Sequence, residues 1–200
     1  MPTLGITGGI ATGKSTFTTS LLRLIPAEAF DADRCAHNLL ANDPAIRAKI
    51  LATFGAEVVN SDGTPNRARL RELVFQDATK RSALEEILHP TVRECWISQA
   101  KQPHRVGRWL FVDIPLLFET AAETHCDCVV VVACSSATQR CRLQKKRDVA
   151  EELAARIVAS QLDLSIKIRK ANHLIWNDST LSCLDDQAGL FAGWLRSRYG

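Results

Sequence analysis

The segment Gly8–Ser15 reads GGIATGKS and fits the pattern G-x-x-x-x-G-K-[ST] at every specified position. Glycines let the backbone of such a loop curl, so that successive N–H groups point at the oxygens of a phosphate. An apolar stretch, Thr3–Ile6, precedes the loop, and a helical pattern begins at Lys14. The N-terminus of that helix presents free N–H donors to the same anion. This context favours a phosphate-binding P-loop over a chance glycine-rich turn.

The side chains of the loop have expected roles in binding a nucleoside triphosphate. In P-loop proteins, the lysine reaches the β- and γ-phosphates, and the hydroxyl of the next residue ligates Mg²⁺. Lys14 and Ser15 occupy these positions. We therefore expect ATP and Mg²⁺ as cofactors. The expected nucleotide-binding residues of the loop are Gly8, Gly9, Ile10, Ala11, Thr12, Gly13, Lys14, Ser15 and Thr16.

Three classes of P-loop protein are compatible with such a loop. A GTPase switch needs an Asn-Lys-x-Asp element to read guanine, and the sequence contains none. A motor or remodelling ATPase usually has a longer chain than these 200 residues. A small-molecule kinase needs a carboxylate near the γ-phosphate, an acceptor-binding insertion and a basic lid that excludes water. The sequence offers a candidate for each of these parts.

The candidate carboxylate follows a predicted strand, Ala27–Phe30, in the triplet Asp31-Ala32-Asp33. Ligands bind at the carboxyl ends of strands in sheets of this type, so an acid there could meet an acceptor hydroxyl. The alternative role for Asp33 is an N-cap for a helix that begins at Arg34. Both roles are compatible if Asp31 is structural and Asp33 faces the acceptor.

The candidate insertion is the charge-rich, helical region 34–101. Its pattern is interrupted at Asp43-Pro44, at Asn60–Pro65 and at His89-Pro90. This region predicts an acceptor pocket, and the alternative is a purely structural helical subdomain.

The candidate lid is the region 137–171, where the pattern predicts two helical stretches. The second stretch opens at Glu151-Glu152 and closes with Lys167, Arg169 and Lys170. The first is strongly basic, which favours a clamp on a triphosphate over a solvated charged face. Its basic residues are Arg140, Arg142, Lys145, Lys146 and Arg147.

The remaining apolar runs have strand length and read as buried parallel strands. They are Trp109–Val112, Cys128–Ala133 and Leu174–Trp176, and a last helix is expected at Leu181–Arg198. This alternation predicts an α/β fold, a doubly wound parallel sheet of the P-loop NTPase type with an inserted helical substrate domain and a helical lid. We expect one domain over residues 1–200. Its parts are a nucleotide-binding core (about 1–33, 104–136 and 172–200), the insertion (about 34–103) and the lid (about 137–171).

The composition of the chain mainly argues against certain classes of partner and of site. The net charge of +3 is too small to argue for a nucleic acid or membrane partner. The sequence has neither a signal-peptide pattern at its start nor an apolar run of membrane-spanning length. The seven cysteines lack metal-ligand spacing, which indicates buried, reduced thiols. We expect a cytoplasmic protein that acts on a small molecule as a monomer or weak homo-oligomer.

Beyond the P-loop, the sequence resembles the dephospho-CoA kinase family over nearly its whole length. The resemblance is strongest in Leu84–Pro90 (LEEILHP) and Asp113–Glu119 (DIPLLFE). Within the P-loop, Ala11-Thr12 stands where the family more often has Gly-Ser, and we expect little effect because both residues are small. Further similar residues are Thr7–Ile10, Asp31–Asp33, Phe54-Gly55, Asp62-Gly63, Asn66-Arg67, Leu70, Val74-Phe75, Gln161 and Ile175–Asn177.

The resemblance implies that the γ-phosphoryl of ATP is transferred to the ribose 3′-hydroxyl of dephospho-CoA, the last step of coenzyme A biosynthesis. It implies three catalytic residues: Asp33 as the base, Lys14 at the transferred phosphoryl, and Arg140 from the lid. The residues implied to contact the acceptor substrate are Asp33, His89, Pro90, Leu116 and Glu119. Arg147 and Asn177 are implied to bind the nucleotide, and Ser15 and Asp113 to bind the metal. For His89 and Asp113, the alternatives are a helix-end residue and a strand-end cap. The rival functions are a nucleoside or nucleotide kinase and a non-catalytic nucleotide-sensing switch.

Overall fold

The computed structural model describes residues 2–102, 108–147, 158–159 and 161–199, and the side chains at 145–147 lie outside what it describes. The chain divides into two compact units. The sheet unit comprises Met1–Phe30 and Ala100–Gly200, and the helical unit comprises Asp31–Gln99. The predicted division into core, insertion and lid stays a prediction.

The described part of the sheet unit is built on a five-stranded sheet in the order β2-β3-β1-β4-β5. The central strand β1 pairs in parallel with β3 and β4, and β4 pairs in parallel with β5. Both β1 and β4 are buried along their whole length, as the continuous apolar runs predict for a sheet covered on both faces. The strands are β1 (Thr3–Gly8), β2 (Ala27–Asp31), β3 (Trp109–Asp113), β4 (Cys128–Ala133) and β5 (His173–Trp176).

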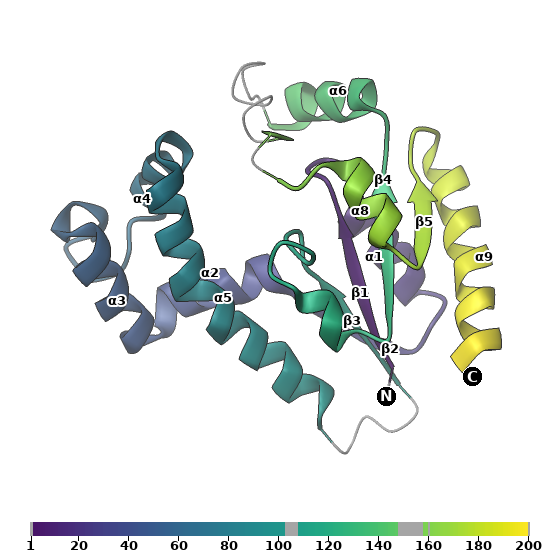
Figure 1. Cartoon of the computed structure of the whole chain (residues 1–200), viewed down its shortest axis with the longest axis horizontal. Helices are drawn as coiled ribbons and strands as arrows, with labels where there is room; N and C mark the ends of the chain where they lie inside the picture. The colour runs from purple at the N-terminus through teal and green to yellow at the C-terminus, as the bar shows by residue number, and fades with distance from the viewer. Residues whose placement is uncertain (1, 103–107, 148–157, 160, 200) are drawn as a thin grey trace. The chain divides into compact units, whose positions relative to one another are not determined.

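Helices lie on both faces of this sheet, which confirms the doubly wound α/β prediction. Phe17 and Leu21 of α1 and Phe191 of α9 share a buried core with side chains of β1, β3, β4 and β5. On the other face, α8 packs against β4, and Figure 1 shows α8 in front of the strands with α1 behind them. The helices are α1 (Lys14–Leu22), α6 (Ser136–Arg147), α8 (Leu164–Lys170) and α9 (Leu181–Tyr199), with a 3₁₀ turn η3 (Ala122–His125).

The predicted lid helices are only partly covered by the described residues. α6 corresponds to the first of them. The predicted opening of the second, Glu151-Glu152, lies outside the described residues. Its predicted basic end is the last turn of α8, which begins only at Leu164, after an N-cap from Asp163. Asp163 accepts a hydrogen bond from the backbone N–H of Ser165 at 2.7 Å, which satisfies one free donor of the first turn.

The helical unit has a hydrophobic core of its own. Asp43 ends α2 and caps α3 by accepting hydrogen bonds from two backbone N–H groups, and Pro44 begins α3, so the predicted break there is confirmed. Its core side chains are Leu40, Ile46, Ile50, Val58, Leu70 and Leu88. Its elements are α2 (Ala32–Asn42), α3 (Pro44–Phe54), the 3₁₀ turn η1 (Ala56–Val58), α4 (Arg67–Gln76) and α5 (Ala78–Ala100), whose last residue belongs to the sheet unit.

The predicted interruption at His89-Pro90 is wrong, because α5 runs through Pro90 without ending. Proline removes one backbone N–H donor and usually kinks or ends a helix. Here Leu88, Val92 and Trp96 are buried at a spacing of four residues, on one face of the helix. Burial of that continuous face on both sides of Pro90 favours an unbroken helix over a new loop.

The seven cysteines are all free thiols, as predicted, but they are not all buried. Cys128 and Cys134 are buried, whereas Cys141 is exposed on α6. Burial raises the pKa of Cys126 to about 12 and that of Cys128 to about 11. These two thiols therefore stay protonated and unreactive at neutral pH.

No helix in the described ranges has the length and apolar character that crossing a membrane requires.

Candidate active site

The P-loop is the turn between the end of β1 at Gly8 and the start of α1 at Lys14. Gly13 has a φ of 96°, and a Cβ atom there would lie 2.2 Å from Nδ2 of Asn177. Both its backbone conformation and its close approach to Asn177 therefore require glycine. The buried Thr12 hydroxyl donates to the carbonyl of Gly9 at 2.8 Å and stabilises the curl.

Ala11 occupies the left-handed region, with a φ of 58°. A non-glycine residue in this region costs about 1–2 kcal/mol. The small size of alanine was one basis of the expectation of little effect, and the backbone conformation adds a preference for glycine at this position.

The loop opens into a cavity of about 430 Å³. The first turn of α1 lines one wall, so its free N–H donors and the positive end of the helix dipole face the cavity. Such a site can bind phosphate. The lining residues are Gly9, Ala11, Thr12, Gly13, Lys14, Ser15 and Thr16 from the loop and α1, Arg142 from α6, and Asn177, Ser179, Leu181 and Leu184 from the chain after β5.

Arg142 and Asn177 hold the opposite wall against the loop. Nη1 of Arg142 donates to the Thr12 carbonyl at 3.3 Å, and Nη2 donates to Oδ1 of Asn177 at 3.5 Å. Nδ2 of the buried Asn177 donates to the same Thr12 carbonyl at 2.8 Å. The structure thus brings the predicted Asn177 to the P-loop, together with an arginine that sequence reasoning did not select.

Arg140 and Arg147 were the predicted arginines of the lid. Arg140 is exposed on α6, and the side chain of Arg147 lies outside the described residues. Arg142 lies beside the buried Gln139 and Leu143 on the inner face of α6, and only the structure shows which face of this helix is buried. Composition alone could not choose among five basic residues.

Two glutamines hold one residue of the P-loop from both sides. Nε2 of Gln139 donates to the Ile10 carbonyl at 2.7 Å, and the Ile10 N–H donates to Oε1 of Gln161 at 3.0 Å. Gln161 was part of the family resemblance, whereas Gln139 had no signal beyond its place on α6.

The two predicted metal ligands, Ser15 and Asp113, lie on α1 and β3. Ser15 is exposed in the first turn of α1 and lines the cavity. Asp113 ends β3 and pairs in register with Ile6 of β1, just before the P-loop begins. Mg²⁺ usually takes one or two protein oxygens and completes its shell with phosphate oxygens and water. Within the described ranges, no group of three or more His, Cys, Asp or Glu could hold a metal. The hydroxyl of Ser15 and the carboxylate of Asp113 are oxygen donors of the kind that Mg²⁺ prefers, and their role as its ligands stays a prediction.

Asp31, the last residue of β2, has the structural role that one of the predictions gave it. The N-cap of α2 is Asp31, whose Oδ1 accepts a hydrogen bond from the Arg34 N–H at 2.9 Å. α2 begins at Ala32, so the alternative of Asp33 as the N-cap is wrong. Asp33 lies in the first turn of α2 with an exposed side chain. Its base role stays a prediction.

The remaining predicted substrate residues are divided between the two units. His89 and Pro90 lie on α5 in the helical unit. Burial lowers the pKa of His89, and the charge of Arg93 lowers it as well, whereas the charge of Glu85 raises it. The imidazole is therefore neutral at pH 7. Leu116 and Glu119 follow β3 in the sheet unit, and Glu119 already accepts a hydrogen bond from the backbone N–H of Leu162.

A parallel sheet in this order, with a P-loop between β1 and α1 and a basic helix at the nucleotide cavity, defines a P-loop kinase. A family model described as dephospho-CoA kinase matches residues 2–182. The chain therefore belongs to the dephospho-CoA kinase family, a family of ATP-dependent kinases, which confirms the resemblance found in the sequence.

Individual relatives agree with this assignment. The chain is 36% identical over 190 residues to the dephospho-CoA kinase of Listeria monocytogenes, with 94% of each chain covered. It is 38% identical over 179 residues to that of Bacillus cereus, with 89% of each covered. The structure matches a dephospho-CoA kinase from Campylobacter jejuni with a TM-score of 0.71 and 25% identity, over 96% of both chains.

Proposed function

We propose that this chain transfers the γ-phosphoryl of ATP to the ribose 3′-hydroxyl of dephospho-CoA, giving ADP and coenzyme A. The family match over residues 2–182 is the observation that carries the proposal. The P-loop cavity, which contains the predicted Lys14, Ser15 and Asn177, supports it from the geometry. The reaction is the last step of coenzyme A biosynthesis.

Phosphoryl transfer is catalysed mainly by positioning and by electrostatic stabilisation. In the proposed mechanism, the backbone N–H groups of the P-loop and the Lys14 ammonium hold the phosphates and stabilise the charge that develops on the transferred group. Asp33 accepts the proton of the acceptor hydroxyl. Ser15 and Asp113 would hold Mg²⁺, which would offset negative charge on the phosphates. His89, Pro90, Leu116 and Glu119 are the proposed contacts to the acceptor.

The two lid arginines have separable roles in this proposal. Arg142 lines the cavity and offers a flat guanidinium face, which suits stacking on a nucleotide base. Arg140 is the proposed phosphate ligand.

We expect Arg142→Met to raise the KM for ATP by about 10-fold, the loss of a stacking contact of about 1.4 kcal/mol. Arg140→Met should instead lower kcat. Steady-state kinetics on both variants measures the difference, and an unchanged KM for ATP in Arg142→Met would refute the stacking role.

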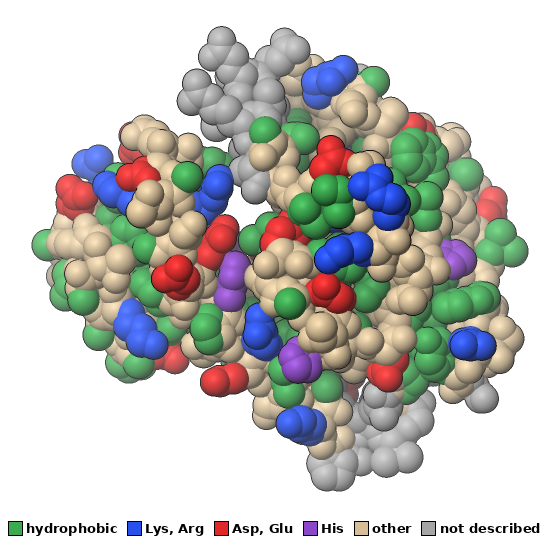
Figure 2. Space-filling view, viewed as in Figure 1, with side chains coloured by type: hydrophobic (Ala, Val, Ile, Leu, Met, Phe, Trp, Pro, Cys, Tyr) green, Lys and Arg blue, Asp and Glu red, His purple; other side chains and the backbone are tan. Residues whose placement is uncertain are grey.

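The partners follow from the same proposal. Figure 2 shows one face of the molecule, on which the basic, acidic and hydrophobic side chains of the described residues are intermixed. The small net charge of +3 supports a small-molecule partner over nucleic acid or a membrane. We propose a cytoplasmic enzyme that works as a monomer or weak homo-oligomer.

The function is tested by an ADP-release assay with dephospho-CoA, adenosine, uridine and AMP as acceptors in parallel. The proposal predicts fast, acceptor-dependent ADP release with dephospho-CoA and background rates with the others. Preference for adenosine, uridine or AMP would identify a nucleoside or nucleotide kinase. Tight ATP binding without ADP release for any acceptor would identify a nucleotide-sensing switch.

A further inference from the structure

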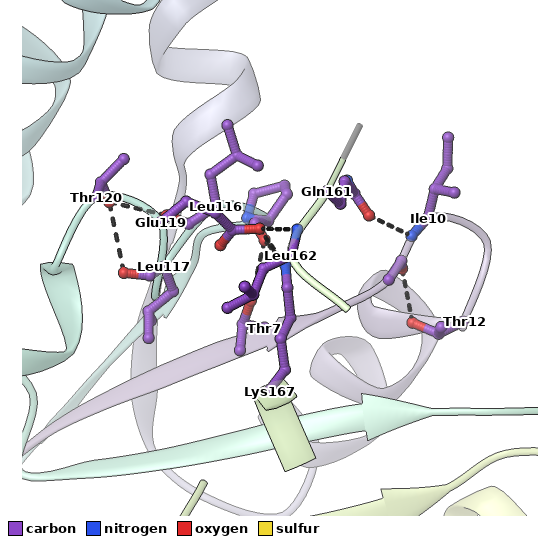
Figure 3. Close-up of polar contacts among 12 residues, drawn as sticks. Thr7, Ile10, Thr12, Leu116, Leu117, Glu119, Thr120, Gln161, Leu162 and Lys167 are labelled. Carbon is purple, nitrogen blue, oxygen red and sulfur yellow. Dashed lines mark hydrogen bonds and ion pairs between the residues drawn. The ribbon is translucent and has the colours of Figure 1, made fainter. Parts of the chain in front are cut away.

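Lys167 on α8 has a fully buried side chain, with 0% exposure. Lysine is almost never fully buried unless its charge is paired. Its Nζ donates to the Pro115 carbonyl at 2.8 Å and lies 2.8 Å from Oε1 of Glu119 (Figure 3). One ammonium therefore holds two points of the loop that follows β3.

The same two acceptors also bind other segments. Oε1 of Glu119 accepts the backbone N–H of Leu162 at 2.9 Å, just before α8. The Pro115 carbonyl accepts the hydroxyl of Thr7, on β1 immediately before the P-loop, at 3.1 Å. Lys167 is thus the centre of a network that joins β1, the loop after β3 and both ends of the segment Gln161–Lys167.

This network ends at the P-loop itself. Gln161 is the neighbour of Leu162 in the chain, and its Oε1 accepts the Ile10 N–H at 3.0 Å (Figure 3). When Glu119 holds the Leu162 N–H, the Gln161 backbone beside it is held as well. The side chain of Gln161 can then keep its hydrogen bond to the P-loop.

Stability alone does not account for a charge at this position. Taking an ammonium out of water is costly, and apolar residues of similar volume often replace buried ion pairs without loss of stability. Burial lowers the pKa of Lys167, Glu119 raises it, and the charge of Lys14 lowers it further.

We propose that Lys167 is a positioning residue of this kinase, which sets the P-loop conformation at Ile10 through Glu119, Leu162 and Gln161. The inference rests on the proposed function and adds a residue that acts through another group instead of touching a substrate. It implies that Lys167 and Gln161 form one functional unit. Removing both should therefore affect catalysis no more than removing one.

A double-mutant cycle with Lys167→Met and Gln161→Ala tests this coupling. We expect each single variant to lower kcat by about 10- to 100-fold, as displacements of about 1 Å near a reaction do. The double variant should be no slower than the slower single variant, within about 2-fold. The matched control is Lys170→Met on the same helix, where the half-exposed Lys170 lies 3.7 Å from Glu123. Its kcat should stay within about 2-fold of wild type.

Two results would overturn the inference: multiplicative effects of the two substitutions on kcat, or normal kcat in folded Lys167→Met. A purely structural lysine would lower the midpoint of thermal unfolding without coupling to Gln161. If Lys167→Met does not fold, the same cycle is measured with Glu119→Ala in its place, and the same lack of additivity is expected.

A second readout separates this inference from the proposed function. ATP affinity is measured by calorimetry without an acceptor, and both single variants and the double variant should weaken it by the same factor. A wild-type chain that does not phosphorylate dephospho-CoA would refute the proposed function alone. Unchanged ATP affinity together with multiplicative effects on kcat would refute the positioning role alone.

Discussion

Lys14→Ala is expected to lower kcat by at least about 10²–10³-fold, the loss seen when one donor to a developing negative charge is removed. Lys14 is the first residue of α1 and lines the cavity, where its ammonium can reach the phosphates. The side chain is only partly buried and does not belong to the hydrophobic core. The variant should therefore fold normally, and kcat together with circular dichroism measures both parts of the prediction.

The control for this variant is Lys49→Ala, which removes an exposed lysine from α3. Its kcat should match that of the wild type. The prediction fails if Lys14→Ala retains near-normal turnover. Loss of the native circular dichroism signal would instead show that Lys14 supports the fold.

Asp33→Asn is expected to lower kcat by about 10²–10⁴-fold, the usual contribution of a general base. The amide cannot accept the acceptor's proton, whereas ATP should still bind because Asp33 is not among the residues that line the P-loop cavity. Kinetics with dephospho-CoA and ATP titration of the variant measure the two effects.

Asp31→Asn is a matched control for this substitution. Asp31 caps α2 through its Oδ1, and asparagine caps a helix about as well as aspartate. The control should keep both its stability and its turnover. Normal turnover in Asp33→Asn would show that the first-turn acid only complements the dipole of α2.

The sequence predicted the sheet and the P-loop because both depend on local patterns. Continuous apolar runs marked β3 and β4, and glycine spacing marked the loop between β1 and α1. The family resemblance extended this reading to most of the chain, and the family match over residues 2–182 confirmed it.

Features that depend on tertiary packing were harder to predict. The continuous α5 contradicts the usual effect of Pro90, because a buried face on both sides favours the helix. Arg142 lines the cavity whereas Arg140 is exposed, and choosing between these two arginines requires the exact start and packing of α6. Lys167 looks like a surface lysine in a basic helix end, and only the fold reveals that it is buried against Glu119.

The most direct test of the proposed reaction is the identity of its product. Wild-type chain, Mg·ATP and dephospho-CoA are incubated together, and the products are analysed by ³¹P NMR and mass spectrometry. We predict one new phosphomonoester on the ribose 3′-oxygen of dephospho-CoA, formed in equal amount to ADP. Inorganic phosphate as the main product, or a phosphoryl group on another oxygen, would contradict the account.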